Sequence, residues 1–170
     1  MKGVVLSGGH GTRLRPLTHT GPKQLIPIAN KPNILYCLED LREAGITDIG
    51  VILGDIMPER VREALGDGTE WGLRLTYIEQ GAPRGIAHAI QCAESFVGEE
   101  PFCVYLGDNV LKGSIRPMVE AFLAGGHEAA VLLSRVPHPE RFGVVEVDAD
   151  GHVLSLVEKP KEAKSDLALV

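Results

Sequence analysis

Short apolar runs alternate along the chain with longer amphipathic stretches. Runs of this kind predict strands at residues 3–6, 49–53, 73–78, 102–106 and 129–134. Their nearly continuous apolar character indicates that both faces of each strand are buried, which is typical of a parallel sheet covered by helices. The pattern therefore predicts an α/β fold, a Rossmann-like and mostly parallel sheet with helices on both faces.

Stretches with apolar residues at helical spacing lie between these runs. Pro32 opens the clearest of them and Gly45 ends it, as proline and glycine commonly do at the two ends of a helix. Further helices are predicted at residues 58–65, 86–97 and 115–122. We interpret their apolar faces as packing against the sheet, with a partner-binding face as the alternative.

The sequence becomes rich in turn-forming residues after Val136. Asp150-Gly151 is typical of a hairpin turn, and it separates two strand-like segments at residues 144–148 and 152–157. We therefore expect an antiparallel hairpin as an addition to the parallel sheet.

The length of 170 residues suits a single compact domain. The last residues, 167–170, are all apolar and resemble the beginning of a strand. We therefore expect one N-terminal domain over residues 1–170 that is truncated at its C-terminal end.

The charges are distributed unevenly. The formal net charge of −6 argues against nucleic acid as a partner, because nonspecific binding to phosphates along a duplex needs a broad basic face. The basic residues that precede the first acidic residue, Glu39, are Lys2, Arg13, Arg15, Lys23 and Lys31. A cationic segment in an acidic protein favours a small, highly charged anion as ligand. No apolar run approaches the roughly twenty residues of a membrane span, so we expect a cytoplasmic protein without a membrane partner.

A glycine-rich loop, Leu6-Ser7-Gly8-Gly9-His10-Gly11-Thr12-Arg13, follows the first predicted strand. Ligands of open α/β sheets bind at the carboxyl ends of the strands, and glycines let backbone N–H groups approach a phosphate closely. We interpret the loop as a phosphate-binding loop. It lacks the glycine that a dinucleotide fingerprint needs at Leu14, and it has Arg13-Leu14 where a P-loop has Gly-Lys.

Arg13 and Lys23 supply positive charge near this loop, and we predict them to be catalytic. Fixed positive charge stabilises the additional negative charge that develops when a phosphate is attacked. The alternative is that both are solvated surface cations, which is the usual situation for an isolated Arg or Lys. His10 lies inside the loop and receives no catalytic role.

Asp108 is the candidate metal ligand. It lies in Gly107-Asp108-Asn109, directly after the most apolar predicted strand, where a carboxylate is costly unless a ligand or hydrogen bonds satisfy it. Carboxylate oxygen is the ligand that Mg²⁺ prefers. A helix cap or a turn is the structural alternative.

The sequence motifs together resemble a known enzyme family. The runs LSGGHGTRLRP at residues 6–16, PKQLIPI at 22–28 and NKP at 30–32 resemble the signature of glucose-1-phosphate thymidylyltransferases and related sugar-1-phosphate nucleotidylyltransferases. The likeness continues, over essentially the whole chain, through LGDG at 65–68, YLGDN at 105–109, RFGVVE at 141–146 and EKP at 158–160. The loop and the final residues are most similar to the longer archaeal and actinobacterial enzymes.

This resemblance implies a fold, a reaction and a set of site residues. The fold is that of nucleotide-diphospho-sugar transferases, and the reaction joins dTTP and glucose 1-phosphate to give dTDP-glucose and pyrophosphate, with Mg²⁺ as cofactor. The implied residues bind nucleotide (Leu6, Gly8, Gly9, Gly11, Thr12, Arg13, Gln80, Gly85), contact the reacting phosphates (Arg13, Lys23), hold Mg²⁺ (Asp108), or bind the sugar phosphate (Gly143, Glu158, Lys159).

Several alternatives stay open at this point. Gln80 and Gly85 are explained equally by a strand end and a helix start, and residues 158–160 by a charged turn. Family members extend beyond Val170 and supply a second magnesium aspartate there, so a non-catalytic nucleotide-binding fragment is an alternative function. A UTP- or GTP-using transferase is another, because the phosphate loop is common to the family. A homo-oligomer is an open alternative to a monomer.

Overall fold

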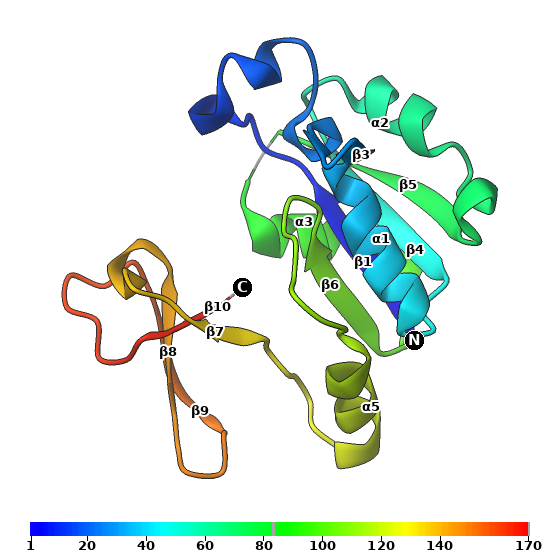
Figure 1. The fold of residues 1–170 in the computed structure, drawn as a ribbon. Coiled ribbons are helices and arrows are strands. Elements are labelled where there is room, and N and C mark those ends of the chain that lie inside the picture. Colours follow the sequence, from blue (N-terminus) through cyan, green and yellow to red (C-terminus); the bar gives the residue numbers. More distant parts are fainter. Residues whose placement is uncertain (83, 170) are drawn as a thin grey trace. The chain divides into compact units, whose positions relative to one another are not determined.

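The computed structural model describes residues 1–82 and 84–169, and it divides into two compact units. Unit 1 covers Met1–Val119 and unit 2 covers Glu120–Val170. Figure 1 shows the elements of both units along the chain.

The centre of unit 1 is a parallel sheet with the strand order β5-β4-β1-β6. Its strands are β1 (Lys2–Ser7), β4 (Asp48–Gly54), β5 (Arg74–Gly81) and β6 (Phe102–Leu106). The register places Val5 between Val51 of β4 and Tyr105 of β6. These four strands confirm the predictions at residues 3–6, 49–53, 73–78 and 102–106.

Helices cover both faces of this sheet, as predicted (Figure 1). Two of them, α1 (Asn33–Glu43) and α2 (Pro58–Leu65), bury apolar side chains against the face that carries Val5. The helices α3 (Ile86–Cys92) and α4 (Glu94–Val97) pack on the opposite face, where Val4 and Leu6 lie. The predicted helix at residues 86–97 is thus divided at Ala93. The helix α5 (Arg116–Gly125) begins in unit 1 and ends in unit 2.

The burial of the strands differs between the centre and the edges of the sheet. The central strands β1 and β4 are buried on both faces, as their apolar runs predict. At the edges, the prediction is wrong: β5 alternates between half-buried and exposed positions, and Phe102 of β6 is 37% exposed. The reason for β5 is visible in its sequence, because the polar residues Arg74, Thr76 and Glu79 interrupt the apolar run and are exposed.

Unit 2 contains a separate four-stranded sheet in the order β7-β10-β8-β9. Its antiparallel strands are β7 (Leu133–Arg135), β8 (Gly143–Val147), β9 (Val153–Glu158) and β10 (Leu167–Leu169). The predicted hairpin is confirmed as β8 and β9. It belongs to this second sheet, and the expectation that it extends the parallel sheet is wrong.

The prediction of a parallel strand at residues 129–134 is also wrong. Residues 129–132 have no regular structure, and β7 pairs antiparallel with β10. Among the described residues, positions 129–132 join none of the strand ladders. The apolar run at residues 167–169 is β10, while Val170 lies outside the described residues.

Smaller elements complete the fold. A two-stranded sheet is formed by β2 (Pro27–Ile28) and β3 (Lys31–Pro32). Single 3-10 turns occur at Thr12–Leu14, Leu17–His19, Lys23–Leu25, Thr69–Trp71 and Pro139–Arg141. Among the described residues, no helix has the length and apolar character needed to cross a membrane.

Candidate functional site

A pocket opens at the carboxyl end of the parallel sheet in unit 1. The strand order reverses at β1, since β4 and β5 lie on one side of it and β6 on the other. Ligands of open α/β sheets bind where the strand order reverses in this way. The pocket has a volume of about 290 Å³ and is lined by Leu6, Gly8, Gly9, Lys23, Ile52, Gln80, Gly85, Ile86, Leu106, Asp108 and Asn109.

The glycine-rich loop needs its glycines for steric reasons. Gly11 has φ 58°, a left-handed conformation that side chains rarely adopt, and a Cβ built on it would lie 2.7 Å from Cγ2 of Thr18. Thr18 is buried, and its hydroxyl donates a hydrogen bond to the carbonyl oxygen of Gly11 at 2.9 Å. The Thr18 side chain therefore packs against Gly11 and bonds to its backbone, and only glycine fits at position 11.

Substituting Gly11 by alanine is expected to destabilise the protein by about 1–3 kcal/mol, because the new Cβ combines a strained backbone with a steric clash. Thermal or denaturant unfolding measures the effect. Gly21→Ala is the matched control, because Gly21 has an ordinary φ and its Cβ would meet only Nη1 of Arg60 at 3.9 Å. Equal stability of the two variants would contradict this interpretation of the loop.

Two buried amide side chains donate hydrogen bonds to the backbone of residues that line the pocket. The sequence alone predicted no role for either of them. Gln24 is 1% exposed, and its Nε2 donates to the carbonyl oxygen of Gly8 at 2.8 Å. Asn33 is 7% exposed, and its Nδ2 donates to the carbonyl oxygen of Asp108 at 3.0 Å. The signal for both in the sequence was an amide side chain beside an apolar residue, since the N–H of a buried amide needs a hydrogen-bond acceptor.

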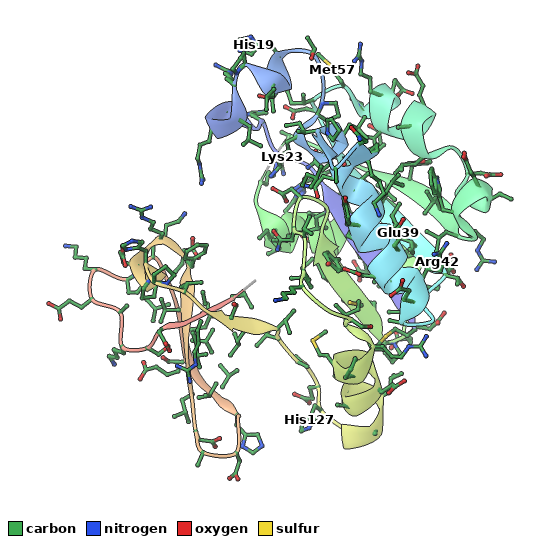
Figure 2. The ribbon with its side chains drawn as sticks, in the orientation of Figure 1. His19, Lys23, Glu39, Arg42, Met57 and His127 are labelled. Carbon is green, nitrogen blue, oxygen red and sulfur yellow. The ribbon has the colours of Figure 1, made fainter. Side chains whose placement is uncertain are left out.

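Lys23 and Asp108 form an ion pair in the pocket. Nζ of Lys23 lies 2.5 Å from Oδ2 of Asp108, and their side chains are 21% and 33% exposed. Lys23 comes from the 3-10 turn at Lys23–Leu25, near the start of α1 (Figure 2), whereas Asp108 follows β6. The structure therefore brings together the predicted catalytic lysine and the predicted metal ligand, which are far apart in the sequence.

The Asp108 carboxylate has the properties of a magnesium ligand. Its side chain is partly exposed at the pocket, and Oδ1 makes no hydrogen bond to any residue that the structure describes. Magnesium in nucleotide sites is commonly bound by only one or two carboxylates, with the substrate phosphates and water as the other ligands. The residues present would therefore fit a magnesium ion, and Asp108 stays its predicted protein ligand.

Gln80 and Gly85 line another side of the pocket. Gln80 lies near the end of β5, and its Nε2 donates to the carbonyl oxygen of Gly85 at 3.1 Å. Its Oε1 faces the glycine-rich loop, since a Cβ built on Gly8 would lie 3.3 Å from this oxygen. Leu6, Gly8 and Gly9 complete the predicted nucleotide residues that line the pocket.

Thr12 and Arg13 are not part of the pocket lining. They belong to the exposed 3-10 turn Thr12–Leu14, which follows Gly11. Arg13 makes no ion pair with any of the described residues. Its guanidinium is available to an anionic ligand that extends from the pocket along the loop.

The predicted sugar-phosphate residues lie together in unit 2. Gly143 of β8 is paired in register with Glu158 of β9, and a Cβ on Gly143 would lie 3.3 Å from Oε2 of Glu158. Nζ of Lys159 lies 3.1 Å from Oε1 of Glu158, and the backbone N–H of Lys159 donates to the carbonyl oxygen of Phe142. One end of the hairpin thus carries all three residues.

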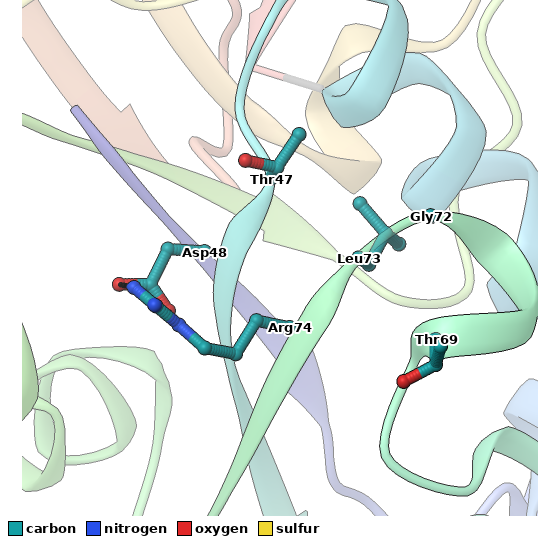
Figure 3. Close-up of a pocket in the computed structure, with 6 residues that line it drawn as sticks. All are labelled: Thr47, Asp48, Thr69, Gly72, Leu73 and Arg74. Carbon is teal, nitrogen blue, oxygen red and sulfur yellow. Dashed lines mark hydrogen bonds and ion pairs between the residues drawn. The ribbon is translucent and has the colours of Figure 1, made fainter.

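A second hollow of about 340 Å³ lies at the opposite end of the parallel strands (Figure 3). Thr47, Asp48, Thr69, Gly72, Leu73 and Arg74 line it. An ion pair between Asp48 and Arg74 spans the first residues of β4 and β5, with 2.7 Å between Nη2 and Oδ2. The guanidinium of Arg74 lowers the pKa of the Asp48 carboxyl below its usual value. This ion pair links the amino-terminal ends of β4 and β5.

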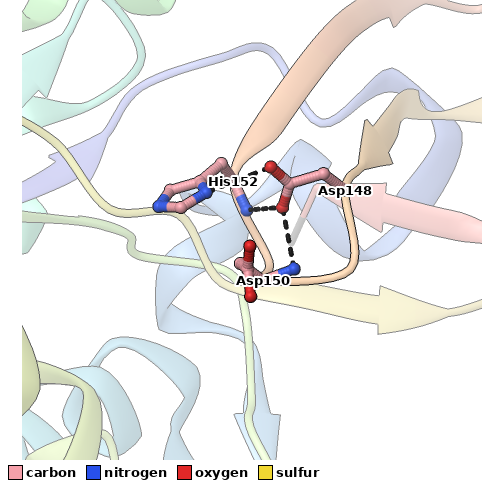
Figure 4. A group of neighbouring side chains, drawn as sticks. All are labelled: Asp148, Asp150 and His152. Atoms are coloured by element: carbon pink, nitrogen blue, oxygen red, sulfur yellow. Dashed lines mark hydrogen bonds and ion pairs between the residues drawn. The ribbon is translucent and has the colours of Figure 1, made fainter.

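Asp148, Asp150 and His152 form a group in unit 2 (Figure 4). Oδ1 of Asp148 accepts the backbone N–H groups of Asp150 and His152 at 3.0 and 2.8 Å, and Oδ2 lies 3.1 Å from Nδ1 of His152. These hydrogen bonds, the backbone one from His152 first, lower the pKa of Asp148. The hairpin turn between β8 and β9 accounts for the group.

Comparison with known proteins gives a consistent result. A family model described as nucleotidyl transferase matches residues 2–170. The chain is 54% identical over 170 residues to the low-salt glycan biosynthesis nucleotidyltransferase of Haloferax volcanii, covering 100% of this chain and 48% of that protein. It is 53% identical over 171 residues to the glucose-1-phosphate thymidylyltransferase of Streptomyces antibioticus, with the same two coverages.

Solved structures similar to this chain belong to the same kind of enzyme. A Bacillus anthracis protein assigned as a glucose-1-phosphate thymidylyltransferase and crystallised with sucrose superposes with a TM-score of 0.95 at 41% identity, covering 99% of this chain and 68% of that one. A UDP-glucose pyrophosphorylase in complex with UDP-glucose superposes with a TM-score of 0.87 at 26% identity. The resemblance and the fold class inferred from the sequence are thereby confirmed. The chain spans about half the length of the curated relatives described above.

Proposed function

Because this chain belongs to the nucleotidyl transferase family, we propose that it transfers a thymidylyl group from dTTP to glucose 1-phosphate, giving dTDP-glucose and pyrophosphate. The observation that carries the proposal is the convergence of the glycine-rich loop, Lys23 and Asp108 in one pocket. A nucleoside triphosphate with its magnesium ion fits this combination. Backbone N–H groups and a cationic side chain bind its phosphates, and a carboxylate binds the metal.

The reaction needs no protein nucleophile. An anionic phosphate oxygen of glucose 1-phosphate attacks the α-phosphorus of dTTP, a new phosphorus–oxygen bond forms, and the bond to the bridging oxygen of pyrophosphate breaks. The task of the protein is to align two anions that repel each other and to stabilise the charge of the transition state. Magnesium, when bound, neutralises phosphate charge.

Different residues of unit 1 would align the nucleotide and stabilise the charge of the transition state. Lys23 presents its ammonium group in the pocket, and Arg13 presents a guanidinium that can donate to two phosphate oxygens at once. Asp108 would hold the magnesium ion, and the loop at Gly8, Gly9 and Gly11 would bind the triphosphate through its backbone.

The remaining residues would select the substrates. Gln80 and Gly85 line the part of the pocket that would receive the base. In unit 2, Gly143, Glu158 and Lys159 would bind the sugar phosphate, with Lys159 supplying positive charge. Both substrates are soluble metabolites, so the proposal places the activity in the cytoplasm.

Pyrophosphate release from dTTP and glucose 1-phosphate in the presence of Mg²⁺ tests the proposal. We expect release that requires all three components. Release from UTP or GTP but not from dTTP would contradict the choice of base, and nucleotide binding without any release would favour a non-catalytic nucleotide-binding fragment.

A further inference from the structure

His88 of α3 contacts Gln80, one of the two amide side chains that line the pocket. Nε2 of Gln80 lies 3.3 Å from Nδ1 of His88 and 3.1 Å from the carbonyl oxygen of Gly85. Both side chains are half-buried. His88 itself is not among the residues that line the pocket. The side-chain contact through which His88 can act on a bound nucleotide is therefore its contact with Gln80.

The two contacts together determine which way the Gln80 amide faces. A side-chain amide has two N–H donors on its nitrogen and an acceptor oxygen. The Gly85 carbonyl can only accept, so the amide nitrogen must face it, and the second N–H is directed to His88. Both donors are then used, and Oε1 is the only polar atom of Gln80 that stays available to a ligand.

The surroundings of His88 are consistent with Nδ1 as an acceptor. A neutral imidazole that accepts at Nδ1 carries its proton on Nε2. Nε2 of His88 lies 4.0 Å from Sγ of Cys92, which is one helical turn further along α3 and can accept a weak hydrogen bond. The buried Ala89 and Ala93 pack against Val4 and Leu6 of β1, so the position of the helix is fixed by the core.

We propose that His88 is a positioning residue for base selection, which occupies the second N–H of Gln80 so that only the amide oxygen faces the nucleotide. This inference rests on the proposed function. An acceptor at this position pairs with the N3–H of thymine or uracil. Cytosine has a lone pair at N3, which an amide oxygen repels. Without His88, the Gly85 carbonyl alone holds the amide nitrogen of Gln80, so the amide rotates more readily. Its N–H can then donate to that lone pair, and the discrimination between the two bases decreases.

The test compares the dissociation constants of dTTP and dCTP, measured by calorimetry with Mg²⁺, for the wild type, His88→Leu and His88→Asn. Leucine removes the acceptor at similar size, whereas the side-chain oxygen of asparagine can replace Nδ1 as acceptor. We expect His88→Leu to lower the preference for dTTP about 3- to 10-fold, which is the effect of one hydrogen bond. We expect His88→Asn to retain the wild-type preference within about 2-fold.

The possible outcomes separate this inference from the proposed function. A wild type without preference for dTTP over dCTP would contradict the proposed base and this inference with it. A selective wild type whose His88→Leu variant keeps the same preference would overturn the role of His88 alone. Equal losses in the asparagine and leucine variants would show that the acceptor is irrelevant and would also overturn it. If the leucine variant does not fold, His88→Ala takes its place in each comparison.

Discussion

Replacement of Asp108 by asparagine is expected to lower turnover about 100- to 1,000-fold. The substitution keeps the shape of the side chain and removes the negative charge that would hold magnesium and that now pairs with Lys23 at 2.5 Å. The dependence of turnover on Mg²⁺ concentration should shift to higher concentrations as well, because amide oxygen is a weaker ligand than carboxylate. Steady-state rates of pyrophosphate release over a magnesium titration measure both effects.

The chain offers a matched control for this substitution. Asp48→Asn makes the same chemical change in an ion pair at the opposite end of the parallel strands. We expect this variant to retain turnover. If Asp108→Asn kept more than about a third of the wild-type rate, an interaction worth several kcal/mol in the transition state would be excluded.

Replacement of Arg13 by alanine is expected to reduce turnover about 100-fold or more while weakening dTTP binding less than about 10-fold. The reason is the position of Arg13 on the exposed 3-10 turn Thr12–Leu14, outside the pocket lining. A guanidinium there contributes little to holding the base. It contributes most when charge accumulates on the phosphates during the attack.

Separate measurements of turnover and of dTTP affinity are needed for this variant. Arg74→Ala is the control, since Arg74 is an exposed arginine paired with Asp48 far from the carboxyl ends of the strands. Equal losses of turnover and affinity in Arg13→Ala would contradict a transition-state role and would instead indicate a simple binding contact.

In unit 1, the sequence predicted correctly those elements whose local pattern of apolar and polar residues matches their burial in the fold. Residues 102–106 and 58–65 have the bounds of β6 and α2, because a continuous apolar run and a Pro-initiated amphipathic stretch each favour one structure. The glycine-rich loop was recognisable because positive φ angles and close packing, as at Gly11 against Thr18, leave glycine as the fitting residue.

Other features depend on contacts that a linear pattern does not contain. Residues 129–132 are as apolar as a buried strand, but they join none of the strand ladders among the described residues. An apolar run favours a strand only where the fold supplies a pairing partner. Gln24 and Asn33 gain their roles from the carbonyl oxygens of Gly8 and Asp108, which are brought near by the fold. His88 is likewise defined by its contact with Gln80.

The position of a bound nucleotide tests the central claim most directly. A crystal structure of the protein with Mg²⁺ and a non-hydrolysable dTTP analogue should show the triphosphate against the backbone of Gly8, Gly9 and Gly11, with the metal on Asp108. A triphosphate bound elsewhere, with this loop free of ligand, would contradict the account.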